Sequence, residues 1–496
     1  MKSIAKKTPI NYGVLIFSFL VVFVSFGMFL NLHFSVDSYS VYYNEDPDIQ
    51  IRNARYLNYI VTLLLNNIQF NLVSNQKILT FSLIISISLC IYFLTGLIAK
   101  ALNKRNKKCN LYWLALSISI SFCNTFILEW FLYPETTLFY AISLLLCMVA
   151  IFVWIKNTRL INLMISITLL TMSLFCYQAT FAFFGIFVFL YLCLKENFNF
   201  NKTNNKIILK TIFVMGISCL FLLISQKFLT RTSEARVASL SLNNLLSNTK
   251  QLLKLQFHLL YNGNGFFPPL VLTVSMITLG GVMYWILIKD EKVSLKKLLY
   301  FSFFSLLFYA IIFTPHLVSQ NLWFAPRTMV AFFSAFSFLA IISFAYSKNS
   351  SGKNVYIVIM ILVMLTANIF TIHTIGLNHF ISNYLDKKTA LEIQEQIQQY
   401  EKETTINIKK IGTTFDSNPS YSYPGISFVK YDTNTKCYCV DWGDVNAINY
   451  YNNTAYEKVV FDSSLVGFLP DRKNWDTFIP EEQLIFVNDT LYWIKY

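Results

Sequence analysis

Apolar runs of roughly 17–22 residues recur along most of the chain, and short polar segments separate them. A run of this length matches the hydrocarbon thickness that a membrane helix must cross. The pattern therefore predicts an α-helical polytopic membrane protein with about 11 transmembrane helices. The runs centre near 12–32, 78–98, 111–128, 138–155, 160–176, 180–194, 207–225, 269–288, 298–314, 329–346 and 355–374.

Lysine and arginine are distributed unevenly among the segments between these runs. One alternating set contains "MKSIAKK", "KALNKRNKK", "KNTR", "KENFNFNKTNNK", "KDEKVSLKK" and "SKNSSGK", whereas "EWFLYPETT" in the other set has no basic residue. Because basic loops stay on the cytoplasmic side, the N-terminus is predicted to be cytoplasmic and the first helix to be an uncleaved anchor. An odd number of crossings then places residues 380–496 outside. If the pair 160–176 and 180–194 only re-enters the membrane, the count falls to nine and the tail stays outside.

The chain changes character after residue 379. The segment "LDKKTALEIQEQIQQYEKET" has helical periodicity, and short β-rich runs follow it: "INIKKIG", "ISFVKY", "KVVFD", "QLIFV" and "TLYWIKY". We expect a transmembrane domain over 1–379, with extracytoplasmic loops 33–77 and 226–268, and a small extracytoplasmic α/β domain over 380–496. Each loop contains an amphipathic stretch that fits either the membrane interface or a helix packed on the protein's own core.

Composition supports the membrane class. Charged residues make up 13% of the 496 residues and hydrophobic residues 55%, whereas soluble domains carry roughly 25% charged residues. The net charge of +14 is not a nucleic-acid signal, because it comes from the short loops: residues 1–379 hold 29 basic and 10 acidic residues, and 380–496 hold 11 and 16. We expect membrane lipid as a partner, and no nucleic acid.

Candidate chemistry is concentrated directly after the first apolar run, in "VDSYSVYYNEDPDIQIRNARYLNYI". The chain has no Walker A, GxGxxG, GxSxG or HExxH motif. Asp37 shares its loop with Arg52 and Arg55, and an adjoining amphipathic helix could bring lipid to it. Transfer from a lipid-linked sugar needs a general base for the acceptor hydroxyl and cations for the leaving phosphate, which arginine binds with two parallel hydrogen bonds. The alternative is that these acids are solvated loop charges.

Asp46 and Asp48 lie in an "EDPD" segment that contains a D-x-D triplet. Such a triplet binds a divalent metal in nucleotide-sugar enzymes, but it is short and often accidental. The sequence therefore leaves a divalent metal open without indicating one. Asp46 and Asp48 are secondary candidates for the acid, and we expect no cofactor.

An acid after the first transmembrane helix, the "RNARYLNYI" behind it and a later "YQ" at the end of a middle span resemble the glucosyltransferase II family of serotype-converting enzymes. That family typically has paired aspartates, whereas this chain reads Val36-Asp37-Ser38. The resemblance implies a GT-C-like enzyme of the bacterial inner membrane that moves glucose from undecaprenyl phosphate. The acceptor would be a lipid-linked O-antigen, modified at the periplasmic face, and the loops and tail would then be periplasmic.

By the same resemblance, Asp37 becomes the candidate base and Arg55 the phosphate contact, with Arg52 beside it. Tyr177 and Gln178 would line the pocket, or would be only a polar pair at a helix turn. Glu135 is a further pocket acid that could take the place of Asp37. Arg327, in "FAPRTM", would meet the phosphate or anchor a helix end.

Two other functions remain open from sequence. A flippase or transporter of lipid-linked sugars would place ionisable residues inside its spans, whereas these spans are nearly free of charge. An O-antigen polymerase or another polyprenyl-phosphate-sugar transferase would use the same donor chemistry with a different acceptor. Sequence does not distinguish these acceptors.

Overall fold

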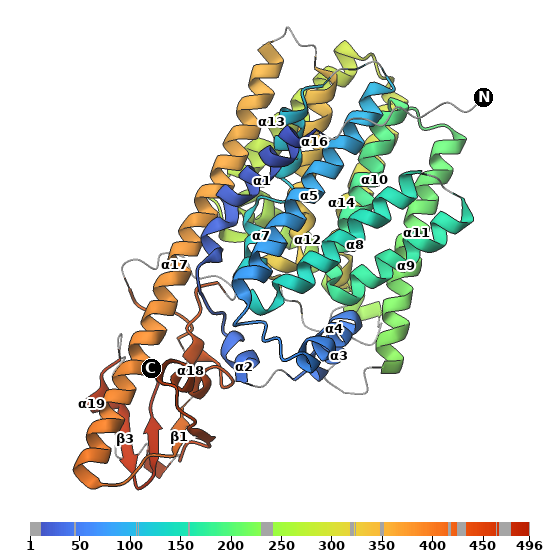
Figure 1. Cartoon of the computed structure of the whole chain (residues 1–496). Helices are drawn as coiled ribbons and strands as arrows, with labels where there is room; N and C mark the ends of the chain where they lie inside the picture. Colours follow the sequence, from blue (N-terminus) through green and yellow to red (C-terminus); the bar gives the residue numbers. More distant parts are fainter. Residues whose placement is uncertain are drawn as a thin grey trace.

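The structure is a computed structural model, and most of the molecule is a bundle of α-helices with a small sheet at one end (Figure 1). It describes residues 11–43, 46–105, 107, 109–156, 159–229, 242–317, 322, 324–347, 352–414, 418–423, 433–462, 464–465 and 478–495. The main bundle helices are α1 Tyr12–Phe26, α5 Gln76–Asn103, α6 Leu111–Ser119, α7 Thr125–Phe131, α8 Thr137–Lys156, α9 Leu160–Cys176, α10 Phe181–Glu196, α11 Lys202–Leu229, α13 Val271–Trp285, α14 Leu295–Ile311, α16 Ser334–Tyr346 and α17 Gly352–Thr404.

Every predicted apolar run falls on a helix, so the prediction of a helical membrane protein is confirmed. The predicted number of about 11 crossings is not confirmed. By length and composition, seven helices in the described part of the chain could cross a membrane. The other four runs form shorter helices, namely α6 with α7, α9, α14 and α16. One cause is local: Asn124 caps α7 by accepting from the backbone N–H groups of Phe126 (3.0 Å) and Ile127 (3.1 Å), which divides the run 111–128 into two helices.

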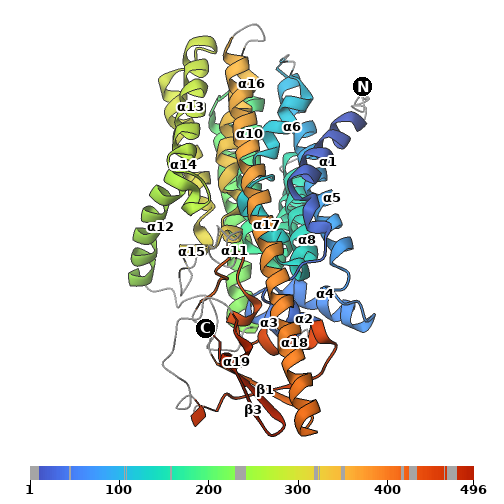
Figure 2. The same ribbon diagram turned by 90° about the vertical axis from the view of Figure 1, so that its left-hand side faces the viewer.

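Helix α10 lies at the centre of the bundle (Figure 2). Nearly nine-tenths of its apolar window is buried (89%), against 28–33% for the windows of α1, α11, α13 and α17. It packs against α5, α8, α11, α14 and α16. Phenylalanine rings dominate the contacts, for example Phe189 stacked 5.0 Å from Phe308. The peripheral helices are left with exposed apolar side chains, as expected of surfaces that face lipid.

Helix α17 is 53 residues long and continues past the predicted domain boundary at 379/380 into the C-terminal region (Figures 1 and 2). The sheet beside its end has the strand order β2-β1-β4-β3. Strand β1 pairs in parallel with β2 and β4, and β3 is antiparallel to β4. The predicted strand "ISFVKY" lies outside the described residues. The strands and C-terminal helices are β1 Lys410–Thr413, α18 Asp444–Asn452, β2 Glu457–Val459, α19 Pro480–Gln483, β3 Leu484–Val487 and β4 Thr490–Trp493.

Apolar side chains of the loop after α1 pack in the core of the C-terminal region. Phe34 and Tyr39 are buried in one cluster with Ile393 of α17, Ile448 of α18 and Trp493 of β4. The Asn383 side chain fastens this loop to α17: its oxygen accepts from the Phe34 N–H (2.6 Å), and its nitrogen donates to the Phe34 carbonyl (3.0 Å). The helices of this loop are α2 Ser38–Tyr43, α3 Asp48–Arg52 and α4 Tyr56–Asn67, and the remaining helices are α12 Leu242–Asn262 and α15 Thr314–Leu317.

The two amphipathic stretches form α4 and α12. The side chains of α4 that are buried against the protein are Tyr56, Asn58 and Thr62, whereas Ile60 and Leu64 are exposed. Ile60 and Leu64 are thus turned away from the protein's own core, whereas Val61 and Leu65 pack against the small cluster of Leu72, Leu79 and Phe139. This orientation favours the membrane interface over the alternative of core packing for α4.

Candidate active site

Asp37 lies between the end of the first helix and α2. It is partly buried, and its backbone N–H donates to Ser35 Oγ (3.0 Å). Its carboxylate accepts a hydrogen bond from the indole N–H of Trp442, with 2.9 Å between Nε1 and Oδ1. Trp442 belongs to the C-terminal region, so a residue 405 positions away holds the candidate base. Nothing in the local sequence around Asp37 signals this partner.

Glu135 is brought against the same loop. It lies in the 3₁₀ turn η2 (Pro134–Thr136) and is 3% exposed. Its two carboxylate oxygens accept from the hydroxyls of Ser35 (2.8 Å) and Ser38 (2.7 Å). Ser35 therefore binds both the Asp37 backbone and the Glu135 carboxylate. The loop that carries Asp37 thus has a second, buried acid built into it from another part of the chain.

The segment leading to Asp37 is anchored by His33. Its Nδ1 lies 2.8 Å from the carbonyl oxygen of Asn31 and its Nε2 lies 2.8 Å from that of Phe131 at the end of α7. Burial lowers the pKa of His33, and the two carbonyl contacts act in the opposite direction without overcoming it. Through these two contacts the ring fixes the loop against α7.

Arg327 forms a buried ion pair with Glu129, which lies six positions before Glu135 in the chain. The Glu129 side chain is 1% exposed and that of Arg327 is 13% exposed. One carboxylate oxygen accepts from the guanidinium and the other from the Arg327 backbone N–H (2.7 Å). The guanidinium also lies over the ring of Tyr133, 4.7 Å from its centroid. Sequence reasoning missed Glu129 as the partner of Arg327.

Arg55 lies over the ring of Tyr177. Its guanidinium is 5.3 Å from the centroid of the Tyr177 ring, while the Tyr177 hydroxyl donates to the Arg327 carbonyl (2.9 Å). Gln178 donates to the carbonyl of Asn53 (3.3 Å), close to Arg55 in the chain. Ala54, between them, has φ +56°, a conformation that costs a non-glycine residue energy and sets the turn from α3 into α4.

The turn at Tyr177, directly after α9, is held by a dense set of contacts. Hydroxyls of Ser143, Ser173 and Thr180 contact one another at 2.7–3.1 Å, and Thr180 also donates to the Tyr177 carbonyl (2.9 Å). The Tyr140 ring packs edge-on against Tyr177 at 4.7 Å and stacks on Trp130 at 4.8 Å. Buried hydroxyls that satisfy one another in this way hold a single geometry.

Two buried hydrogen-bond donors around Tyr177 have no acceptor among the described residues. They are Nε of Arg55 and Nε1 of Trp130, whose ring lies 5.9 Å from that of Tyr177. An unpaired buried donor costs about 1–3 kcal/mol. Arg55 also forms no ion pair in the described part of the chain, in contrast to Arg327. The arrangement therefore suits a ligand that brings anionic and hydroxyl oxygens to this place.

The other predicted residues lie apart from this cluster. Arg52 pairs with Asp46 (3.1 Å), and both side chains are more than two-fifths exposed. Asp46 also accepts from the Asp48 backbone N–H (3.0 Å) at the start of α3, and Asp48 is exposed. Among the described residues, no three His, Cys, Asp or Glu side chains gather as a metal site would require.

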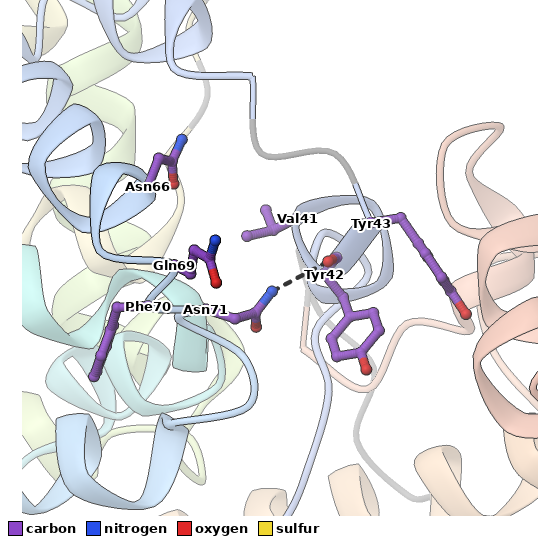
Figure 3. Close-up of a pocket in the computed structure, with 7 residues that line it drawn as sticks. All are labelled: Val41, Tyr42, Tyr43, Asn66, Gln69, Phe70 and Asn71. Carbon is purple, nitrogen blue, oxygen red and sulfur yellow. Dashed lines mark hydrogen bonds between the residues drawn. The ribbon is translucent and has the colours of Figure 1, made fainter.

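A shallow groove opens beside the far end of α2 (Figure 3). Its volume is about 290 Å³, and its lining is uncharged. Asn71 donates to the Tyr42 carbonyl (3.1 Å), which fixes one wall, while Asn66, Gln69 and Tyr43 are exposed at the rim. The lining residues are Val41, Tyr42, Tyr43, Asn66, Gln69, Phe70 and Asn71.

These features define a class: a helical membrane protein whose loops assemble acids, arginines and aromatic rings at one end of the bundle. The chain matches the family model described as glucosyl transferase GtrII over residues 26–344, and it belongs to this family. The sequence-based resemblance is therefore confirmed, and the protein is a glucosyltransferase. Neither a curated protein nor a solved structure matches the chain. The matched region contains the whole bundle except most of α1 and α17.

Proposed function

We propose that this glucosyltransferase moves a glucosyl residue from undecaprenyl-phosphate-glucose to a lipid-linked O-antigen, at the periplasmic face of the bacterial inner membrane. The observation that carries the proposal is the pair of unpartnered buried donors, Arg55 Nε and Trp130 Nε1, beside Tyr177. A phosphate oxygen would satisfy the arginine, and a sugar hydroxyl would satisfy the indole. Both needs are met by one molecule, a sugar linked to a phosphate.

In this proposal, Asp37 accepts the proton of the acceptor hydroxyl as its oxygen attacks the anomeric carbon of the glucosyl group. The bond between that carbon and the phosphate oxygen breaks, and the departing phosphate keeps the electron pair. Arg55 stabilises the charge that develops there. Glu135, held by Ser35 and Ser38, keeps the loop of Asp37 in place. The backbone carbonyl of Arg327 accepts from the Tyr177 hydroxyl, so Arg327 positions Tyr177 and is not the main contact of the phosphate.

The donor would approach from lipid and the acceptor from the C-terminal side. The exposed apolar face of α4 lies directly after Arg55 in the chain, so it can seat the polyprenyl tail while the phosphate reaches the guanidinium. The uncharged amides and tyrosines of the groove suit the hydroxyls and ring faces of an acceptor glycan. Helix α2 connects the candidate base with the groove, because it begins next to Asp37 and ends at Tyr43 in the groove lining.

The test is the composition and linkage of O-antigen from a strain of known repeat structure, with and without this gene. Gain of one glucosyl branch per repeat would support the proposal, and an unchanged repeat would contradict it. The side of the membrane is tested separately with reporter fusions at Lys104 and Thr405. We expect opposite signals, the first cytoplasmic and the second periplasmic; a cytoplasmic signal at Thr405 would place the site on the wrong face.

A further inference from the structure

Trp442, in the C-terminal region, donates a hydrogen bond to the Asp37 carboxylate. It lies between the turn η8 (Cys437–Cys439) and α18. Its indole N–H donates to Asp37 Oδ1 (2.9 Å), yet the side chain as a whole is 52% exposed. The polar edge is therefore engaged while much of the ring remains open beside the candidate base. Residue 442 also lies outside the family match, which ends at 344.

The position of this indole is built into the packing around it. A Cβ on Gly443 would lie 2.5 Å from the Cys437 carbonyl, which excludes a larger residue without a shift, and 3.1 Å from the Val36 carbonyl, which shows how closely the two segments pack. Asn446, four positions after Trp442, donates to the Trp442 carbonyl (2.9 Å). These contacts place residue 442 against the backbone immediately before Asp37.

The two segments are further joined through their helices. The ring of Phe34, just before α2, and that of Tyr39 in α2 pack against the rings of Tyr450 and Tyr451 in α18. The ring centroids are 4.9–6.1 Å apart. The hydroxyls of Tyr39 and Tyr451 lie 2.7 Å apart. Phe34 and Tyr39 are buried and the two tyrosines are half-buried, so aromatic packing joins α18 to the Asp37 loop. The Trp442–Asp37 hydrogen bond is thus a property of the fold and not a chance surface contact.

We propose that Trp442 is a positioning and acceptor-binding residue of the transfer site: its N–H orients the Asp37 carboxylate, and its exposed ring is the platform on which the acceptor sugar lies. This inference rests on the proposed function and names the acceptor contact within it. A hydrogen bond from a rigid donor fixes a carboxylate that a flexible loop would otherwise leave mobile. An exposed indole face offers a large rigid apolar surface to the C–H face of a pyranose, at low conformational cost.

Two substitutions separate the two roles. Trp442→Phe keeps an aromatic ring but removes the N–H, so kcat should fall about tenfold while KM for the acceptor stays within about twofold. Trp442→Ala removes both, so kcat should fall similarly and KM for the acceptor should rise about tenfold. Tyr423→Ala, which removes another half-exposed aromatic side chain of the C-terminal region, is the matched control and should change neither value.

The assay uses the purified full-length protein with undecaprenyl-phosphate-glucose and a lipid-linked O-antigen repeat, at matched melting temperatures. Binding of the donor alone should be unchanged in all three variants. Wild-type kcat and KM in Trp442→Ala, with Asp37→Asn inactive, would overturn this inference and leave the proposed function intact. Equal KM values in Trp442→Phe and Trp442→Ala would refute the platform. Full activity of Asp37→Asn would instead refute the assignment of the base, whatever Trp442 does.

Discussion

The structure separates the roles of two arginines that looked alike in sequence. Arg327 is neutralised by buried Glu129, whereas Arg55 has no ion pair in the described part of the chain. We therefore expect Arg327→Leu to cost folding stability, because it leaves a carboxylate that is 1% exposed without its counter-charge; such losses are about 3–5 kcal/mol. Arg55→Lys should cost little stability. It should instead lower kcat/KM for the donor by about 10–100-fold, because lysine keeps the charge but loses the two-pronged geometry.

The measurements are thermal melts in detergent and glucosyl transfer by the same preparations. Arg105→Lys is the control: Arg105 is exposed at the opposite end of α5, where its Nε donates to the Lys195 carbonyl (2.7 Å), and its replacement should be silent in both assays. Restoring neutrality with Glu129→Gln in the Arg327→Leu background should recover part of the lost melting temperature. Wild-type transfer by Arg55→Lys, with Arg327→Leu folded but inactive, would reverse the two assignments and refute this reasoning.

Three further predictions test neighbouring parts of the site. Asp37→Asn keeps the Trp442 hydrogen bond but cannot accept the proton, so transfer should fall about 10²–10⁴-fold at an unchanged melting temperature; near-wild-type turnover would move the base to Glu135. Tyr43→Ala with Gln69→Ala should raise KM for the acceptor several-fold without affecting donor binding, and a donor effect would exclude the groove as an acceptor site. Burial lowers the pKa of His33, so the folded state disfavours the charged ring and the free energy of unfolding should fall as pH drops below about 6.5; His33→Gln should flatten that fall in melts taken between pH 7.5 and 5, and an equal fall would assign it to other groups.

Sequence was sufficient for those features that local pattern determines. Apolar runs located the helices, and the short motifs that carried the family resemblance also carried Arg55, Tyr177 and Gln178. The structure brings these residues together with Arg327 around one tyrosine. The same information overestimated the helices long enough to cross, because a polar cap such as Asn124 divides an apolar run without changing its average hydropathy. Arg52 was grouped with Arg55 because the two are close in the chain. However, α3 ends at Arg52, and the exposed Arg52 side chain pairs with Asp46.

The partners that sequence could not supply are the non-local ones. Glu129 and Arg327 are 198 positions apart, Ser38 and Glu135 are 97 apart, and Trp442 and Asp37 are 405 apart. Pairing of this kind is set by which helix ends meet, and helix order along the chain leaves many arrangements open. In "CVDWGDV" the glycine fits a backbone contact, because a Cβ on Gly443 would lie 2.5 Å from the Cys437 carbonyl, and the tryptophan fits its hydrogen bond to Asp37.

The charges of the site imply an order of events. Glu129 neutralises Arg327, so the uncompensated cation in the described part of the cluster is Arg55, whose Nε and the nearby Trp130 Nε1 are both buried donors without an acceptor. Binding an anionic, oxygen-rich donor relieves both deficits at once, whereas a neutral acceptor glycan that binds first leaves the charge of Arg55 uncompensated. The acceptor side, with Trp442 and the uncharged groove, carries no such penalty when empty. Donor affinity should therefore be nearly independent of acceptor, and the donor should bind to the protein in the absence of any glycan.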